Sequence, residues 1–416
     1  MMGMQKTEGR FLTGHKTRNR WMGCILLFIM SLCLSGCWDR RELQERYFVL
    51  AVAIDSAGEG ERGKDKKQVA QVENFVQPHG SKRYRLSLQI LQLIPSGNSE
   101  EKRGTTGVSI ISTTGESMDE MIWDLLGQSD KELWFEHLQA IVISEAAAKQ
   151  GGLGPIFDFY HRNEEIRWLT KVVITHGEAR SLLEYKPPSG EASGMFIANS
   201  LRMYGKSSHV LGWHTDIGDI SISTENKRRV LIPRVELNDN VIKLGGTGVF
   251  RQEKFVDYID EYATQGSKFI SGKAKSALIT FECPMHPGKI SAFELFSQET
   301  KLMPHLEGDK LYYTLDIQMK GNIGEMQCSQ EHSTIKPEEI HTYEMLAAEA
   351  VKKNILYTFY SLQRVKVDGT AFAQKLQAYN PLMWERLKDK WDEEVFPNLT
   401  LEVSVNVVIE NVGSHW

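Results

Sequence analysis

One cysteine stands where a covalent modification is chemically feasible. Residues Leu34-Ser35-Gly36-Cys37 have the form of a bacterial lipobox. The small side chains of Ser35 and Gly36 let a peptidase grip an extended backbone immediately before the thiol. Cleavage would make Cys37 the new N-terminus, its thiol carrying a diacylglycerol and its amino group an acyl chain such as palmitate. We therefore predict lipidation at Cys37, as an S-diacylglycerol, N-acyl cysteine.

The segment before this cysteine has the features of an export signal. Lys16, Arg18 and Arg20 form a basic flank, and the apolar run at 21–34 is fourteen residues long. A helix of that length, at about 1.5 Å per residue, reaches about 21 Å and falls short of the roughly 30 Å hydrocarbon core of a bilayer. We predict that residues 1–36 are a lipoprotein signal peptide that is removed. An ordinary signal peptide with an incidental cysteine is the alternative.

A second group of possible ligands lies far along the chain. Cys283-x2-His286 and Cys328-x3-His332 have the residue types of a four-ligand zinc site, without the paired CxxC spacing of zinc ribbons. The exported side of a membrane is oxidising, so a disulfide is a further option. We prefer two independent thiols over either alternative and predict that neither cysteine holds a metal.

The sequence offers little that points to catalysis. Neither Gly-x-Ser-x-Gly nor His-Glu-x-x-His occurs in the sequence. The twelve histidines are dispersed along the chain, and acid pairs such as Asp119-Glu120 are consecutive, so their side chains point in different directions. We predict a protein that is not an enzyme and needs no cofactor.

The net charge of the chain limits the kinds of partner that it can bind. The whole chain has a net charge of −5, and without the first 36 residues, which hold five basic residues and one acid, the net charge is −9. An acidic protein is a poor binder of nucleic acid and gains nothing from an anionic lipid surface. No later apolar run reaches eighteen residues, so we expect attachment to the membrane through lipid on Cys37.

The first half of the chain alternates strand and helix patterns. The nearly continuous apolar run 48–54 is typical of a strand that is covered on both faces. Further strands are predicted at 84–90, 108–111, 137–144 and 168–175, and a helix is predicted from Met118. This pattern favours a mixed sheet with flanking helices.

The second half of the chain has a different pattern of apolar residues. Residues 311–319 and 399–409 alternate apolar and polar side chains, which predicts antiparallel strands with one wet face. Between them a long helix is predicted to begin at Pro337, to end near Arg364 and to stop before Gly369. Its apolar stripe, which should lie across the sheet, comprises Ile340, Tyr343, Ala347, Val351, Ile355, Phe359 and Leu362.

These patterns predict a multi-domain α+β fold. The N-terminal half should hold a mixed sheet with flanking helices, and the C-terminal half an antiparallel sheet crossed by the long helix. We divide the chain into the signal peptide (1–36), an N-terminal α/β domain (37–212), a middle or linking domain (213–268) and a C-terminal domain (269–416). The first break should fall near residues 205–225.

Several stretches together resemble one family. The lipobox, the following "CWDRRELQE" and an apolar strand ending at Ile54-Asp55 resemble the C-subunit lipoproteins of spore nutrient germinant receptors, the Ger(x)C family. The "GTGVF" stretch at 246–250 resembles the opening of that family's second region. Further matching positions are Phe135, His137, Glu145, Ala148, Lys149, Arg162, Glu165, Arg167, Trp384, Trp391, Phe396 and Gly413. Asn163 and the stretch "VDGTAFAQKL" depart from the family pattern.

The resemblance implies a function that the residues alone do not reach. It implies a non-enzymatic, lipid-anchored subunit on the outer face of the cell membrane or spore inner membrane, needed for nutrient-triggered germination. The implied partners are a multi-spanning A subunit and a transporter-like B subunit, with no nucleic acid. The alternative is a lipid-anchored extracytoplasmic solute-binding protein, which would need two similar doubly wound lobes with a cleft between them.

Overall fold

The computed structural model describes residues 45–57, 83–92, 107–203, 209, 215–225, 229–283, 286–308, 310–327 and 337–412. The predicted signal peptide, Cys37, Cys328 and Gly413 lie outside these ranges. Within them, no helix is both long and apolar enough to cross a membrane.

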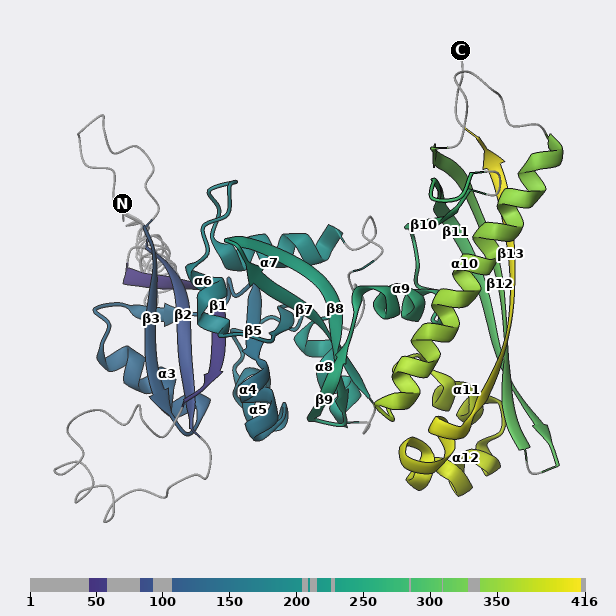
Figure 1. Cartoon of the computed structure of the whole chain (residues 1–416). Coiled ribbons are helices and arrows are strands. Elements are labelled where there is room, and N and C mark those ends of the chain that lie inside the picture. The colour runs from purple at the N-terminus through teal and green to yellow at the C-terminus, as the bar shows by residue number, and fades with distance from the viewer. Residues whose placement is uncertain are drawn as a thin grey trace, which may run out of the picture. The chain divides into compact units, whose positions relative to one another are not determined.

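A mixed sheet of nine strands is built from the first part of the chain (Figure 1). Its main path runs β3-β2-β1-β5-β6-β7-β8-β9, and β4 pairs with β1. Strands β1, β5, β6 and β7 run parallel, whereas the pairs on either side of this group are antiparallel. The strands are β1 (Arg46–Ser56), β2 (Tyr84–Gln92), β3 (Gly107–Gly115), β4 (Glu132–Trp134), β5 (Ala140–Ser144), β6 (Lys171–Thr175), β7 (Val230–Asn238), β8 (Val241–Arg251) and β9 (Lys254–Ile259).

Helices cover both faces of the parallel part of this sheet. Val52 and Ile54 of β1 belong to the apolar cluster that includes α3 and α5, whereas Ala51 and Ala53 pack with α6 and α7. The predicted strand with two covered faces is therefore confirmed. The helices are α3 (Met118–Gly127), α4 (Glu145–Gly151), α5 (Gly154–Arg162), α6 (Ala179–Glu184), α7 (Ser193–Arg202) and α8 (Ile217–Glu225).

Two strands of this sheet are shorter than their sequence patterns predict. The predicted strand 137–144 begins only at Ala140, and the predicted strand 168–175 begins only at Lys171. Trp168 and Leu169 are exposed instead of paired. Their apolar side chains extend the strand pattern, but the backbone there bonds to the start of α8, since Gly218 N donates to Trp168 O at 3.0 Å.

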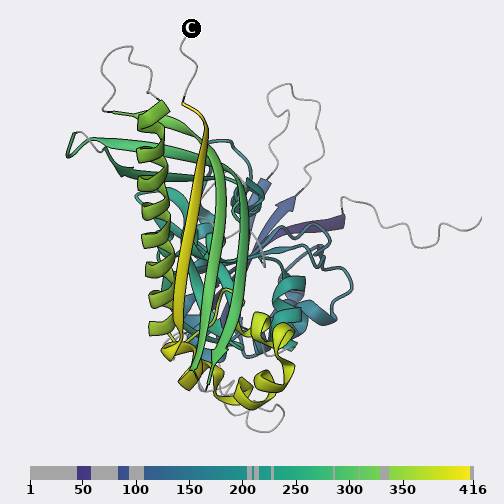
Figure 2. The same cartoon turned by 90° about the vertical axis from the view of Figure 1, so that its right-hand side faces the viewer.

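A second sheet of four strands forms the C-terminal part, with α10 (Pro337–Arg364) lying alongside β13 (Figure 2). The order is β10 (Ala277–Glu282), β11 (Ile290–Glu307), β12 (Lys310–Met326) and β13 (Thr400–Asn411). The antiparallel pairing predicted here holds for β10, β11 and β12. β13 instead joins β12 in parallel, because α10 carries the chain back to the end at which β12 began.

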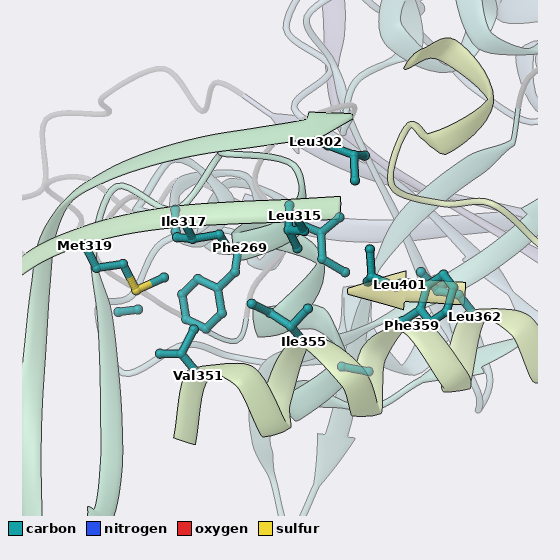
Figure 3. Packing of buried hydrophobic residues seen from close by; sticks show 14 of the residues in the cluster. Phe269, Leu302, Leu315, Ile317, Met319, Val351, Ile355, Phe359, Leu362 and Leu401 are labelled. Carbon is teal, nitrogen blue, oxygen red and sulfur yellow. The ribbon is translucent and has the colours of Figure 1, made fainter. Parts of the chain in front are cut away.

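The long helix meets the sheet through the predicted stripe. Tyr343, Ala347, Val351, Ile355, Phe359 and Leu362 are all buried, and Ile340 packs against the same cluster. Figure 3 shows Val351 and Ile355 of the helix facing Phe269, with Leu315, Ile317 and Met319 of β12 on the other side. The position, bounds and buried face of this helix are as the sequence predicts.

A short helix, α9 (Glu261–Ile270), lies between the sheets and has contacts with both. Every residue from Ala263 to Ile270 is buried, although its sequence is largely polar. Thr264 shares a hydrogen bond of 2.9 Å with Thr247 of β8. On the other side, Thr358 Oγ1 of α10 donates to Ala263 O at 3.2 Å. Polar groups can be buried here because partners from distant elements satisfy them.

The chain after α10 changes helix type several times. It forms α11 (Phe372–Tyr379), α12 (Pro381–Leu387), a 3-10 turn (Lys388–Lys390), a π turn (Trp391–Val395) and a second 3-10 turn (Phe396–Asn398). The rings of Trp384 and Trp391 meet edge to face at 5.5 Å, and Trp391 is fully buried. These turns close the end of the second core before β13 begins.

Cys283 is disulfide-bonded, so the preference for two independent thiols is wrong for this residue. Its partner lies outside the described residues, as does Cys328. Cys283 follows β10, where its backbone N donates to Lys289 O at 2.9 Å, and Gln327 N donates to Ile290 O at 3.0 Å on the other side of β11. The sheet therefore brings residue 283 and the chain before residue 328 to one end. Among the described residues no group of His, Cys, Asp and Glu is arranged to hold a metal ion.

The contact between α9 and α10 has no room for a side chain at Gly266. A Cβ there would lie 2.9 Å from Asn354 O and would collide with the side chains of Asn354 and Thr358. We expect Gly266→Ala to lower the free energy of unfolding by about 1–3 kcal/mol. Gly127→Ala, which meets nothing within 4 Å at the end of α3, should raise it by about 0.5 kcal/mol. Urea unfolding of both variants measures the difference, and equal effects would contradict the close packing.

Lys268 of α9 gives the stability a pH dependence. Burial lowers its pKa from 10.5 to about 8. Between these values the unfolded state binds more protons, so stability should rise with pH by up to about 3 kcal/mol. The window to measure is pH 7.5–9.5, since buried tyrosines such as Tyr160 and Tyr313 have raised pKa values and act in the opposite sense above about pH 10. Lys268→Met should abolish the rise and Lys254→Met, at an exposed site, should keep it; a rise that survives in Lys268→Met would disprove the assignment.

Candidate functional site

Two of the residues picked out by the resemblance lie in the aromatic packing near the start of β1. His137 lies 5.2 Å from the ring of Phe48 and 5.3 Å from that of Trp134. Phe135 is buried against Phe159, with ring centroids 6.1 Å apart. Both rings therefore contribute to the packing between elements.

Glu145, another of these positions, joins three elements where β5, β6 and β9 end. Its carboxylate pairs with Lys149 one turn along α4 and lies 2.5 Å from His176 Nδ1 after β6. Burial alone would raise the pKa of Glu145, but hydrogen bonds from Lys149 and His176 outweigh burial and lower it. Tyr258 of β9 packs beside them, and burial together with the charges of Glu145 and Glu236 raises its pKa.

Asp55, the last residue of the matching N-terminal stretch, caps a helix. Its carboxylate accepts hydrogen bonds from Ala179 N at 2.7 Å and Arg180 N at 3.0 Å, at the start of α6. Burial raises the pKa of Asp55, and the two backbone bonds oppose that rise. Its position at the end of the central strand fixes α6 against the sheet.

The charged positions after α5 have separate roles. Arg162 forms an exposed pair with Asp158 at 3.0 Å, and Arg167 is exposed. Glu165 accepts a hydrogen bond from Phe135 N at 3.2 Å, so the structure brings these two matching positions together. Ala148 is buried within α4. None of these side chains converges with another on a common reacting point.

The second matching region is also structural in character. Gly246 of β8 has a φ of 80°, and a Cβ there would lie 2.9 Å from Ile259 O. This strand position therefore demands glycine. Trp391 and Phe396 are fully buried in the C-terminal core, and Gly413 lies outside the described residues.

A polar cleft of about 930 Å³ opens between β7–β8 and the chain at 368–393. Its least exposed described ion pair joins Arg229 Nη2 and Asp392 Oδ1 at 2.7 Å, and both side chains are less than one fifth exposed. Beside it, Glu393 pairs with Arg251 of β8 and, at 2.9 Å, with Lys366. These pairs connect the first sheet to the segment that closes the second core.

Asp368 is a buried acid in the lining of this cleft. It accepts hydrogen bonds from Phe372 N, Ala373 N and Trp391 Nε1, at 3.1, 2.6 and 3.2 Å. Burial raises its pKa, and the charge of Arg229 with the backbone N–H groups opposes that rise. The carboxylate is occupied by bonds within the protein and caps the start of α11.

The residues that line the cleft connect parts of the protein by ion pairs. Its described lining contains no histidine and no cysteine, so no nucleophile paired with an imidazole base is present there. Arg229, just before β7, and Arg251, at the end of β8, form ion pairs with Asp392 and Glu393 of the segment before β13. Sequence reasoning missed Arg229, Asp368 and Asp392, because single charged residues at 139 and 163 positions' separation carry no pattern that links them.

Removing one partner of the cleft's buried pair should loosen this joint. Asp392→Asn removes the carboxylate that is bonded to the largely buried guanidinium of Arg229 and should lower the free energy of unfolding by about 3 kcal/mol. The matched change Asp158→Asn, in the exposed pair of α5, should cost less than about 0.5 kcal/mol. Urea unfolding measures both. Similar losses for the two variants would show that the Arg229 pair does not stabilise the joint.

Comparison with known proteins covers almost the whole chain. It is 23% identical over 408 residues to spore germination protein YndF of Bacillus subtilis (strain 168), covering 96% of this chain and 98% of that protein. It is 22% identical to spore germination protein KC and 21% identical to spore germination protein B3 of the same organism, covering 94% of this chain and 95% and 97% of those proteins. The crystal structure of the GerBC protein shares the fold with a TM-score of 0.56 and 19% identity, covering 80% of this chain and 96% of that one.

Family models match both halves of the chain. Residues 39–237 match the spore germination protein N-terminal domain, and residues 245–413 match the C-terminal domain described as spore germination B3/GerAC like. The junction between the two matches falls within the β7–β8 hairpin that borders the polar cleft. With both characteristic domains present in order, the chain belongs to the Ger(x)C family of spore germination proteins.

Proposed function

We propose that this protein is the lipid-anchored, non-enzymatic C subunit of a spore nutrient germinant receptor. Its family is that of germinant receptor C subunits, which gives it a role in spore germination. In this proposal it acts at the outer face of the cell membrane or spore inner membrane, beside a multi-spanning A subunit and a transporter-like B subunit. It takes part in nutrient-triggered germination by contact with those partners.

The observation that carries the proposal is the extent of the family match. The two family models run from residue 39 to residue 413, and the first begins two residues after Cys37. A mature chain that starts at Cys37 would therefore consist almost wholly of the two family domains. This supports processing at the lipobox, with the lipid as the attachment to the membrane.

The proposal of a non-enzymatic subunit is supported by the roles of the buried acidic side chains. The most buried acids, Asp55 and Asp368, cap helices, and Glu145 joins α4 to His176. Each is engaged by backbone or side-chain donors of the protein. A subunit that transmits contacts needs such joints, whereas an active site needs groups that are free to meet a substrate.

The fold disfavours the alternative of a solute-binding protein. Such a protein has two similar doubly wound lobes that close on a ligand. Here the first sheet has nine strands and a parallel centre, and the second has four strands crossed by one long helix. Calorimetric titration with amino acids and sugars would distinguish the two functions, since stoichiometric heat from the isolated chain would favour the solute-binding alternative.

We propose a domain boundary near residues 205–225. Residues 213–268 supply β7, β8 and β9, which extend the sheet of the N-terminal domain. The break proposed near residues 205–225 would then fall within one sheet, between β6 and β7. Limited proteolysis with cuts confined to other regions would argue against it.

The lipid anchor is tested at the cysteine itself. Cys37→Ala removes the thiol that accepts the diacylglycerol and should block cleavage between Gly36 and Cys37. We expect the variant to lose most of its partition into the detergent phase, and germination through this receptor to fall sharply. Cys33→Ala, a cysteine in the same segment, is the matched control and should behave as wild type.

Mass measurement of the mature protein separates the two parts of this proposal. Wild-type protein without acyl chains would refute the lipoprotein assignment. If wild-type protein is acylated, normal germination of spores that carry Cys37→Ala would show that the receptor works without the lipid.

A further inference from the structure

The amino ends of the parallel strands share one edge of the first sheet. Lys171 at the start of β6 pairs with Ala140 of β5, and Ala140 pairs with Ala51 of β1. Because these strands run in the same direction, residues just before Lys171 lie at the edge where β1 begins. The chain thus enters the folded part at this edge, at Arg46.

Large apolar side chains are exposed at this edge. Leu169 is 74% exposed and Trp168 is 55% exposed, immediately before β6. Met203, at the C-terminal end of α7, is 53% exposed. Arg202 beside it donates to Gln139 Oε1 at 3.0 Å, which places that helix end at the start of β5. Exposed apolar side chains that gather in one place mark a surface that contacts something other than water.

The loop that carries Trp168 and Leu169 is held in place by the fold. Trp168 O accepts from Gly218 N at 3.0 Å, and Thr170 O accepts from Ile217 N at 3.1 Å. Thr170 Oγ1 donates to Leu138 O at 3.1 Å. The Trp168 ring stacks on His161 at 6.4 Å. The two apolar side chains are therefore presented outward from a fixed backbone.

The short stretch of chain between Cys37 and β1 keeps this edge of the sheet close to the membrane. Arg46 follows Cys37 by nine positions, so even a fully extended connection spans at most about 30 Å. With acyl chains on Cys37, the start of β1 cannot move further than that from the bilayer. We propose that Trp168 and Leu169 insert into the interfacial region of that bilayer and hold the amino edge of the sheet against it. This inference rests on the lipid anchor of the proposed function.

The chemistry of the edge suits the interface more than a charged surface. Tryptophan favours the level of the lipid headgroups, where its ring has both apolar and polar neighbours. Lys171 is paired with Asp216 at 3.3 Å, and Glu164 is exposed near Arg167. Positive charge is thus not in excess here, and attraction to anionic lipid is not needed. A lipid chain plus an apolar contact supplies the two signals that stable attachment requires.

The test places an environment-sensitive fluorophore at either end of one strand. The full lipidated protein is reconstituted in phosphatidylcholine vesicles, with the probe on Leu169→Cys or, as the matched control, on Gly177→Cys. Gly177 follows the carboxyl end of β6, and a Cβ there meets nothing within 4 Å. Wild-type protein treated in the same way gives the background labelling. Leu169 is mostly exposed, so neither change should disturb the fold.

We expect the probe at 169 to shift its emission to the blue and to be quenched several-fold more by brominated acyl chains than the probe at 177. Equal responses at the two positions, or a probe at 169 that stays in water, would overturn the membrane contact and leave this edge to a protein partner. The acyl mass of each sample is measured first. Acylated protein with an aqueous probe refutes only the contact, whereas protein without acyl chains refutes the anchor and the contact together.

Discussion

The burial of α9 constrains the rest of the fold. This ten-residue helix contains threonine, glutamine, serine and lysine, yet every residue from Ala263 onward is buried. Each polar group buried in this way must find a partner or cost free energy. Donors and acceptors come from β8, β10, β11 and α10: Gln265 donates to Leu278 O and Gln298 donates to Phe269 O, at 3.1 and 2.6 Å. The two sheets must therefore be correctly placed before α9 can be buried.

The polar cleft adds a second connection of the same kind. Arg229 precedes β7 of the first sheet, whereas Asp392 lies in the irregular turns that follow α12. Together with α9, this ion pair links the two family domains at separate places. Two separate links hold the two domains in one geometry, so displacement at one surface reaches the other.

Sequence patterns predicted the elements better than their connections. The stripe on α10 and the alternation in β12 and β13 have one buried and one wet face, so their periods are visible in the sequence. The parallel pairing of β13 was not predictable, because the same alternation suits either direction. The exposure of Trp168 and Leu169 could not be predicted for a related reason: two apolar residues before a buried strand look like part of it.

The polar sequence of α9 gave no sign of its burial, which depends on partners up to 95 residues away. The lipidation proposed at Cys37 depends on four adjacent residues, so it can be predicted from the sequence without knowledge of the fold.

The central place of β1 has a mechanical consequence. The first strand of the folded part pairs with β2 on one side and β5 on the other. A load applied through residues before Arg46 acts along the strand axis and meets both ladders at once. Hydrogen bonds loaded in this way share the force and must yield together, whereas a strand at an edge peeled sideways would yield one bond at a time. A chain held by its N-terminus, as a lipid-tethered protein is, thus carries tension on the strand best placed to resist it.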